Sequence, residues 1–231
     1  MSKLSVLIPL YNEEKTIIEI VNKVLKLENL KEVIIVDDCS SDKSHLVVSQ
    51  MTDSRIKLFQ NPKNMGKTAA INLALKHVTG EIIIIQDADL EYDPEEIPDV
   101  IEPILSGKAD VVFGSRFLVK KASRVLYFYH YVANKFLTLL SNVLSNHNMT
   151  DIETCYKAFK SPILKDFELT SKGFGMEVEL TAYITKKNFK IYEVPISYYG
   201  RTYEEGKKIG WKDGVAAIWY IIYYNLFYKF Q

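Results

Sequence analysis

Three acidic side chains follow the most apolar segment of the chain, and their types and spacing suit metal chemistry. In residues 81–93 (EIIIIQDADLEYD), four consecutive isoleucines are followed by Asp87, Asp89 and Glu91. Side chains of an extended chain alternate between its two faces, so we expect these carboxylates to project to one side. Carboxylates held close together repel one another unless a cation lies among them, and their oxygens suit Mg²⁺ or Mn²⁺. The pattern predicts a divalent metal site, and the alternative is a solvated polar loop.

The apolar run before these acids predicts the element that positions them. Four isoleucines in a row are typical of a strand that is buried on both faces of a sheet. Residues 32–38 (EVIIVDD) form a second apolar run that also ends in acids. Open α/β sheets bind ligands at the carboxyl ends of their strands, so both acidic ends should border one site. For Asp37 and Asp38 the alternative is that they only cap the following helix.

Strand-like and helix-like patterns alternate from residue 4 to about 114. This alternation predicts an α/β fold built on a mostly parallel, doubly wound sheet. The expected strands are residues 4–9, 32–38, 55–60, 82–85 and 109–114, and the expected helices begin near residue 12 and cover 67–77 and 94–106. Later in the chain we expect strands at 151–159 and 190–196, helices at 125–144, 175–187 and 211–230, and a mobile loop at 199–210.

The composition argues against several classes of protein. The 231 residues carry 29 basic and 29 acidic side chains, so no bulk charge indicates a nucleic-acid partner. Cys39 and Cys155 lie far apart without a CxxC spacing, which favours the reducing cytoplasm over a disulfide framework. The N-terminal apolar run is too short for a secretory signal. We therefore expect a cytoplasmic protein that binds no nucleic acid.

Several segments, in order along nearly the whole chain, resemble a known family. VLIPLYNEE, VDDCSSD, NMGKTAAIN, QDADLEYDP and GSRF together resemble family 2 glycosyltransferases, which have the GT-A fold. The later segments TDIETCYKAF, KIYEVPISY and GRTYEEGKKIGWKDG are similar to the branch of dolichyl- and polyprenyl-phosphate sugar synthases. The resemblance implies a GT-A domain with a Rossmann-like mixed sheet in residues 1–210. A C-terminal amphipathic aromatic helix would follow in residues 211–231.

The resemblance also implies a reaction. Enzymes of this branch transfer a sugar, with inversion, from a nucleoside-diphosphate sugar (GDP-mannose or a UDP-sugar) to a dolichyl or undecaprenyl phosphate. A divalent cofactor, Mg²⁺ or Mn²⁺, would act as a Lewis acid on the diphosphate leaving group. The residues implied to hold this ion are Asp87, Asp89 and Glu91. Glu91 stands where the best-known mannose synthases of the branch often have Gln, so mannose specificity is not carried over.

Positions that match the motifs of the family give the remaining site residues. The resemblance assigns catalytic roles to Asp89, Asp151 and Arg201, with Arg201 closing over the phosphates. For Lys67 the alternative is an ordinary solvated lysine, and for Arg116 it is a surface charge. The residues expected to bind the nucleotide sugar are Pro9, Tyr11, Glu13, Val36, Asp38, Lys67, Asp87, Ala88, Asp89, Arg116, Arg201 and Lys207.

The sequence leaves the acceptor and two other functions open. If the acceptor attacks with a hydroxyl, as in glycan and polysaccharide synthesis, Asp151 would be the general base. A lipid phosphate is already ionised at neutral pH, and Asp151 would then position the acceptor or the basic loop. A nucleotidyltransferase would also bring acids to a metal, but the chain has no Gly-rich triphosphate loop near its N-terminus. The remaining alternative is a non-catalytic sensor of nucleotide sugars.

Two aromatic helices predict contact with a membrane surface. Residues 214–224 (GVAAIWYIIYY) are apolar but fall short of the ~20 residues of a spanning helix. Tyr and Trp favour the headgroup level, so we expect this helix to lie in the interface. The helix around residues 127–140 would provide a second contact, on the cytosolic face. The alternative is that both helices pack on the sheet or form a homo-oligomer interface.

Overall fold

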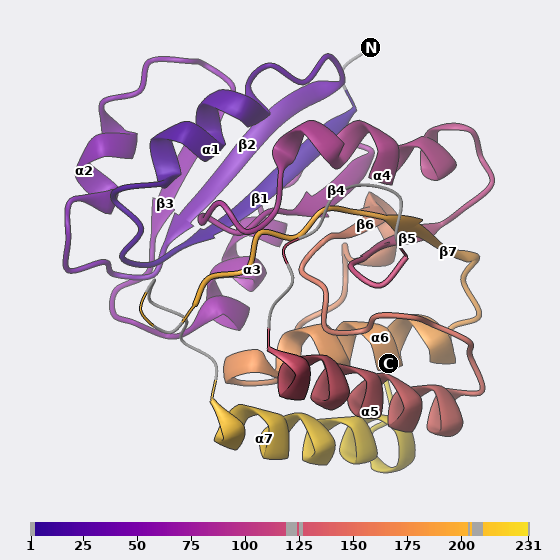
Figure 1. Ribbon diagram of the computed structural model, residues 1–231. Coiled ribbons are helices and arrows are strands. Elements are labelled where there is room, and N and C mark those ends of the chain that lie inside the picture. Colours follow the sequence, from indigo (N-terminus) through magenta and orange to yellow (C-terminus); the bar gives the residue numbers. More distant parts are fainter. Residues whose placement is uncertain (1–2, 119–123, 125–126, 203, 205–209, 231) are drawn as a thin grey trace.

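A mixed sheet with helices on both sides forms the centre of the molecule (Figure 1). The computed structural model describes residues 3–118, 124, 127–202, 204 and 210–230. Within these residues the sheet has seven strands in the order β3-β2-β1-β4-β6-β5-β7. Half of the loop expected at residues 199–210 lies outside the described residues.

The elements follow the expected alternation, with ends that differ by a few residues. The strands are β1 (Leu4–Leu10), β2 (Leu30–Asp37), β3 (Ile56–Gln60), β4 (Ile82–Ile85), β5 (Val111–Ser115), β6 (Lys157–Lys160) and β7 (Ile191–Pro195). The α-helices are α1 (Ile17–Val24), α2 (Ser44–Ser49), α3 (Lys67–Leu75), α4 (Ile97–Leu105), α5 (Phe128–Ser145), α6 (Met176–Lys186) and α7 (Trp211–Ile222). Short 3₁₀ turns cover Pro94–Glu96, Ser161–Ile163 and Gly173–Gly175.

The strand pairing confirms the predicted mostly parallel sheet. β1 pairs in parallel with β2 and β4, β2 with β3, and β5 with β7. Only β6 among the described strands runs antiparallel to its neighbours, β4 and β5. The carboxyl ends of the other six strands therefore lie at one edge of the sheet, together with the amino end of β6. The four isoleucines of β4 are at most 4% exposed, as the sequence predicts for a central strand.

β6 is shorter than the sequence predicts. It begins at Lys157, whereas we expected a strand from residue 151. The buried Nζ of Lys157 donates to the backbone carbonyl of Ile152 at 2.9 Å and also to that of Thr154. These bonds satisfy carbonyl groups that would otherwise need a strand partner, so residues 151–156 adopt an irregular path. Asp151 consequently lies in a loop beside the sheet rather than on a strand.

The C-terminal helices stack together on one side of the sheet. Figure 1 shows α5, α6 and α7 below the sheet, and α1 and α4 on the opposite side. The sequence predicts a helix up to residue 230, but α7 ends at Ile222 and a π-helical turn follows over Tyr223–Phe227. In this turn the N–H of Tyr228 donates to the carbonyl of Tyr223, five residues earlier, at 2.9 Å. Tyr224 is buried, so one side of this segment packs on the fold.

A buried carboxylate, Glu32, connects β1, β2, β3 and the loop before β4 near the amino ends of these parallel strands. Its oxygens accept hydrogen bonds from Ser5 Oγ (2.6 Å), Lys57 Nζ (2.6 Å) and the backbone N–H of Thr79 (2.7 Å). Burial alone would raise the pKa of Glu32, but these donors lower it from 4.5 to about 2. Since the folded protein keeps this carboxylate ionised at a lower pH than the unfolded chain does, its ionisation stabilises the fold.

We expect Glu32→Gln to reduce the free energy of unfolding by about 3 kcal/mol at pH 7. A lowered pKa contributes stability that is complete above pH 4.5 and is lost as pH falls toward 2. Urea unfolding at pH 7 and pH 3 should therefore show a smaller difference between the two proteins at the lower pH. Glu81→Gln, which removes one partner of an exposed ion pair with Lys3, is the control and should change little. A difference of equal size at both pH values would contradict the assignment.

Candidate functional site

The carboxyl ends of three parallel strands border a cavity of about 310 Å³. β1, β2 and β4 end at this edge, and the residues that follow them enter the lining. The acidic strand ends therefore do border one site, as the sequence predicts. The lining residues are Pro9, Leu10, Tyr11, Glu13, Asp38, Asn64, Gly66, Lys67, Ala70, Asp87, Ala88, Asp89, Glu91, Tyr198 and Arg201.

Hydrogen bonds between the loops after β1 and β2 fix one wall of the cavity. The carbonyl oxygen of the Asn12 side chain accepts the N–H of Ser41 at 2.8 Å, and Ser40 Oγ accepts the N–H of Asn12 at 3.0 Å. Ser44 Oγ accepts the N–H of Glu13 at 2.9 Å. Asn12 has a φ of 54°, a left-handed conformation that asparagine tolerates better than most residues. The two loops therefore hold Glu13 at the cavity as one unit.

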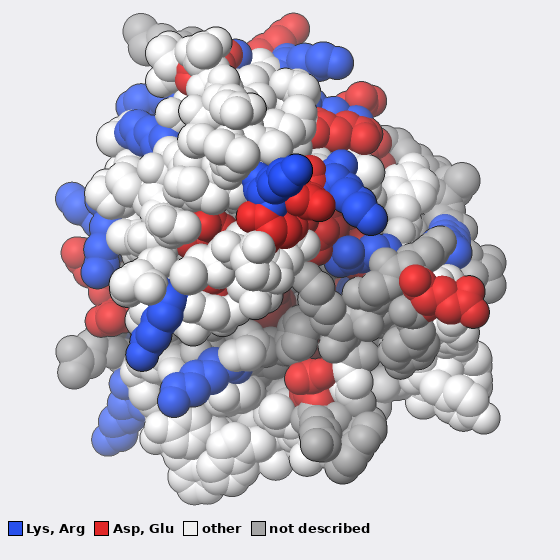
Figure 2. Space-filling view, turned by 90° about the vertical axis from the view of Figure 1, so that its left-hand side faces the viewer, with Lys and Arg blue, Asp and Glu red and all other residues white. Residues whose placement is uncertain are grey.

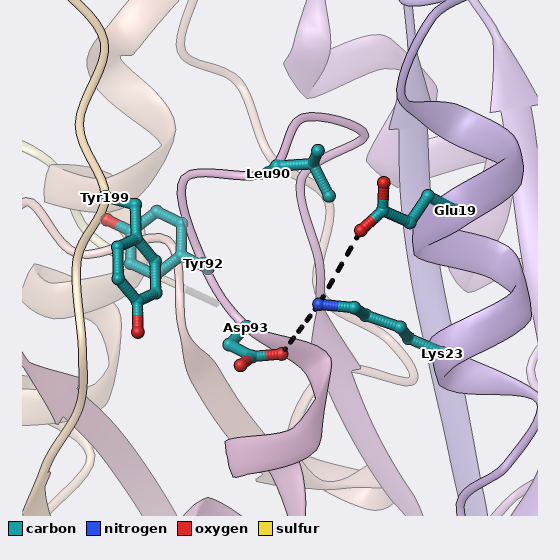
Figure 3. A pocket seen from close by; sticks show the side chains of 6 residues that line it. All are labelled: Glu19, Lys23, Leu90, Tyr92, Asp93 and Tyr199. Atoms are coloured by element: carbon teal, nitrogen blue, oxygen red, sulfur yellow. Dashed lines mark hydrogen bonds and ion pairs between the residues drawn. The ribbon is translucent and has the colours of Figure 1, made fainter.

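The loop after β4 borders two hollows. Asp87, Asp89 and Glu91 line the cavity at the strand ends together, as the sequence predicts, but Ala88 lines it too, because the loop bends and does not continue as an extended strand. Leu90 and Tyr92 face a second hollow of about 270 Å³ (Figure 3). The two hollows therefore share a wall formed by this loop. The second hollow is lined by Glu19, Lys23, Leu90, Tyr92, Asp93 and Tyr199.

One guanidinium contacts three of the cavity carboxylates. Arg201 Nη2 lies 2.7 Å from Asp89 Oδ2, Nε lies 3.1 Å from Glu91 Oε1, and Nη1 lies 3.4 Å from Glu13 Oε1. Figure 2 shows acidic side chains gathered near the middle of this side of the molecule, with basic side chains beside them. Burial raises the pKa of Asp89 to about 7, the carboxylates of Asp87 and Glu91 add to this rise, and Arg201 opposes it. The cavity thus concentrates negative charge around one cation.

A second cation, Lys67, forms an ion pair with Asp87, which Arg201 does not contact directly. Lys67 Nζ lies 2.8 Å from Asp87 Oδ1 and 3.0 Å from Glu177 Oε1 of α6. Burial alone would lower the pKa of Lys67, but the Asp87 carboxylate, with Cys155 and Glu177, raises it. Lys67 is therefore a half-buried, paired cation rather than the solvated lysine that was the alternative.

A buried ion pair lies beside the cavity. Arg116 donates to the two oxygens of Asp151 through Nε (2.7 Å) and Nη2 (2.8 Å), and its backbone N–H adds a third bond at 3.1 Å. The Asp151 side chain is fully buried. Burial alone would raise the pKa of Asp151, but Arg116 keeps it below its ordinary value. Arg116 is therefore not a surface charge, and the Asp151 carboxylate is held ionised by its partner.

The chemistry of the cavity suits a hard divalent cation, although the predicted ligands are not assembled. Among the described residues, no three His, Cys, Asp or Glu side chains are arranged to hold a metal ion. The reason is that Lys67 holds Asp87, whereas Arg201 holds Asp89 and Glu91. Asp89 and Glu91 nevertheless offer carboxylate oxygens that already converge on one positive group, and Asp87 lines the same cavity, so the donor set fits Mg²⁺ or Mn²⁺.

Of three further residues predicted to bind the nucleotide, Asp38 lines the cavity, Val36 does not, and Lys207 lies beyond the described residues. Val36 is completely buried in β2 and does not line the cavity, because its side chain points into the core. Asp38 lines the cavity, but its oxygens accept the backbone N–H groups of Met65 (2.9 Å) and Gly66 (2.6 Å). Asp38 therefore orders the loop that opens α3. Lys207 lies outside the described residues.

Tyr198 and Glu177, which contact charged residues of the site, are among the residues that were not predicted. Tyr198 lines the cavity, donates from its hydroxyl to Glu91 Oε2 at 2.8 Å, and has its ring centroid 5.2 Å from the guanidinium carbon of Arg116. The sequence could have indicated Tyr198, because it lies three residues after β7, at the edge of the sheet where the other parallel strands end. Glu177, the partner of Lys67, offered no local signal because it lies 110 residues away.

A comparison with protein families identifies the chain. The profile described as Glycosyl transferase family 2 matches residues 5–167, well over half of the sequence. The chain belongs to glycosyl transferase family 2. The matched region contains β2 to β6, nearly all of β1 and all five acids that line the cavity, so the family profile covers the acidic part of the site.

Curated relatives confirm the resemblance of this family 2 chain to the polyprenyl-phosphate branch. It is 28% identical over 213 residues to a dolichol-phosphate mannosyltransferase of Pyrococcus furiosus, covering 90% of this chain and 60% of that protein. It is 31% identical over 214 residues to an undecaprenyl-phosphate 4-deoxy-4-formamido-L-arabinose transferase of Salmonella choleraesuis, covering 90% and 63% respectively. The chain thus spans about three fifths of the length of these relatives.

Solved structures share the fold of this family 2 chain. Glucosyl-3-phosphoglycerate synthase from Mycobacterium tuberculosis, in complex with Mn²⁺, uridine diphosphate and phosphoglyceric acid, has a TM-score of 0.74. The alignment covers 99% of this chain and 80% of that one, at 18% identity. The likeness confirms the GT-A type of α/β fold that the sequence predicts.

Proposed function

We propose that the chain is an inverting glycosyltransferase that transfers a sugar from a nucleoside-diphosphate sugar to a polyprenyl phosphate. The observation that carries the proposal is the acidic cavity at the carboxyl ends of β1, β2 and β4, in a member of family 2. Relatives named for transfer to dolichol phosphate and undecaprenyl phosphate support the acceptor class.

The donor would occupy the cavity with its nucleoside against the loops after β1 and β2. Tyr11 and Pro9 offer an apolar wall there, and Tyr11 is 39% exposed, so its ring is accessible to a base. The diphosphate would lie near Arg201 and Lys67, whose positive charges stabilise a phosphate leaving group. A change of partner from carboxylate to phosphate suits an arginine, because both anions accept its paired donors.

Asp89, with Asp87 and Glu91, would hold a Mg²⁺ or Mn²⁺ ion. Bound there, the ion would neutralise charge that develops on the diphosphate as the sugar leaves. The protein contributes the converging carboxylates and a cavity in which Asp89 and Glu91 are each about 15% exposed. Structural neighbours crystallised with Mn²⁺ and uridine diphosphate support the same cofactor class, at the level of a shared fold.

The state of Asp151 favours a phosphate acceptor over a hydroxyl acceptor. A general base must take a proton from the attacking group, and it needs an accessible oxygen to do so. Both oxygens of Asp151 already accept bonds from Arg116, and the side chain is fully buried. A phosphate needs no base, since it is ionised at neutral pH. Asp151 would then act through Arg116, which it orients beside the cavity.

The acceptor class can be tested with radiolabelled donors. The purified protein would be incubated with Mn²⁺, a labelled GDP- or UDP-sugar, and vesicles that contain undecaprenyl or dolichyl phosphate. We expect label in the organic phase, released by mild acid as a sugar phosphate ester would be. Label found only in water-soluble glycan when sugar acceptors are added would support the hydroxyl alternative, with Asp151 as the base.

The same proposal includes contact with the cytosolic face of a membrane. α5 and α7 pack against each other, and both lie at the lower side of the molecule in Figure 1. Their outer surface carries large exposed apolar side chains, among them Phe128 (69%), Tyr129 (84%) and Trp219 (60%). In the part of the chain that the structure describes, no helix combines the length and the apolar character needed to cross a bilayer. A lipid-linked acceptor makes a membrane the occupant that suits this surface.

We expect Phe128→Ser and Trp219→Ser each to weaken binding to vesicles of phosphatidylcholine and phosphatidylglycerol about tenfold, because each removes a ring from the lipid interface. Vesicle co-sedimentation measures the effect. Leu46→Ser removes a side chain of similar exposure (52%) from α2, which is remote from α5 and α7, and is the matched control. Equal binding of all three variants and the unchanged protein would contradict the membrane role of the surface.

A further inference from the structure

Arg201 lies inside the cavity and contacts carboxylates that a divalent cation would need. Its side chain is 25% exposed, and those of Glu13, Asp89 and Glu91 are 14–15% exposed. The guanidinium donates to all three acids through three different nitrogens. The guanidinium and the three carboxylates are thus largely shielded from solvent and contact one another. The positive charge of Arg201 lies where the three acids converge.

Glu91 also fastens the backbone from which Arg201 projects. Its Oε2 accepts the hydroxyl of Tyr198 at 2.8 Å, its backbone carbonyl accepts the N–H of Tyr199 at 2.9 Å, and its Oε1 accepts the N–H of Arg201 at 3.1 Å. Segment 198–201 is thereby held along the acidic loop. Rotation of the Arg201 side chain alone would therefore be enough to free Asp89, without movement of the backbone.

We propose that Arg201 is a built-in counter-ion that occupies the cation position of the free protein and yields it only to a divalent cation that arrives with a nucleoside diphosphate. The inference rests on the proposed function, since it assumes that this cavity binds both. A cation alone must compete with a guanidinium that is tethered to the chain at high effective concentration. A diphosphate changes this balance, because its oxygens offer the displaced guanidinium a new paired acceptor.

Mn²⁺ binding, measured by the electron paramagnetic resonance of the free ion, tests the proposal. Without nucleotide, we expect Arg201→Gln to bind Mn²⁺ at least tenfold more tightly than the unchanged protein, because three carboxylates lose their competing cation. Arg201→Lys keeps a positive charge and should bind Mn²⁺ nearly as weakly as the unchanged protein. Arg55→Gln is the matched control, since Arg55 pairs with Asp53 at the surface, and it should leave Mn²⁺ binding unchanged.

A second measurement follows the unchanged protein, and a variant is needed only to assign one resonance. The ¹⁵N resonance of Arg201 Nε, assigned by its absence in Arg201→Lys, reports on the partner of the guanidinium. We expect millimolar Mg²⁺ alone to leave this resonance in place, and Mg²⁺ with UDP or GDP to move it. Movement by Mg²⁺ alone would overturn the proposal.

The outcomes separate this inference from the proposed function. If Arg201→Gln and the unchanged protein bind Mn²⁺ equally well without nucleotide, Arg201 does not guard the position and the inference is wrong. If neither protein binds Mn²⁺ even with UDP or GDP present, the metal-dependent function itself fails. Tighter binding by Arg201→Gln alone, with the difference reduced when nucleotide is added, supports both.

Discussion

Replacing Asp89 by Asn should reduce kcat about a thousand-fold, even at saturating Mn²⁺, in the assay for lipid-linked product. Asp89 lies between Asp87 and Glu91 in the cavity and accepts the shortest contact from Arg201. Asparagine keeps the shape of the side chain and one oxygen, but it removes the charge on which cation binding depends. Because the change is nearly isosteric, we expect the fold to persist, as circular dichroism would verify.

Asp93→Asn is the matched control for this prediction. Asp93 belongs to the same acidic run, but it faces the second hollow, where Lys23 Nζ lies 3.4 Å from its Oδ1 (Figure 3). We expect this variant to keep most of its activity, because the wall formed by the loop separates it from the donor cavity. Near-normal turnover by Asp89→Asn in saturating Mn²⁺ would refute the metal role of the acidic loop.

The buried ion pair between Arg116 and Asp151 should have a large effect on the stability of the fold. We expect Asp151→Asn to lower the free energy of unfolding by about 3 kcal/mol, because it leaves the Arg116 guanidinium buried without a full counter-charge. Arg116→Gln should cost a similar amount for the converse reason. The double variant should cost less than the two single changes together, since neither charge is then left alone. Urea unfolding of the four proteins measures the coupling.

An exposed ion pair provides the comparison. Lys108 and Glu102 are each about 60% exposed and 3.8 Å apart, so Glu102→Gln should hardly change the unfolding midpoint. If the two single changes at Arg116 and Asp151 were strictly additive, the pair would not be a coupled unit. The stability loss also bears on activity, because a fall in turnover of Asp151→Asn must be corrected for the folded fraction before it is attributed to a missing base.

Features that depend on residues close together in the chain could be predicted from the sequence. The run of isoleucines predicted a central strand, and Asp87, Asp89 and Glu91 line one cavity as predicted, although the loop bends so that Ala88 lines it too. Parallel strands bring their carboxyl ends to one edge, so the meeting of Asp87 with the loops after β1 and β2 also followed from pattern. The same reasoning does not say whether an individual side chain points into a cavity or into the core, and Val36 points into the core.

Contacts between distant residues could not be predicted in this way. The pairs that set the electrostatics are Arg201 with Asp89, 112 residues apart, and Lys67 with Glu177, 110 residues apart. No periodicity connects such positions, because their approach depends on how β6, β7 and α6 close against the first strands. The family resemblance supplied the identity of Arg201 as a site residue, but not its position among the acids of the free protein.

The pairing of β4 with the reversed strand β6 joins two groups of strands, β1 to β4 from the first part of the chain and β5 to β7 from the second. The acids of the donor cavity come from residues 13–91, whereas Arg116 and Asp151 come from segments that follow α4. The two groups of strands meet through three residue pairs between β4 and β6. Under the proposed function, recombination within α4 would join the cavity acids to a foreign C-terminal half. That half would have to supply partners for Asp89, Glu91 and Lys67, as Arg201, Tyr198 and Glu177 do here. If these partners were kept, the acceptor side could change while the acids of the cavity stayed the same.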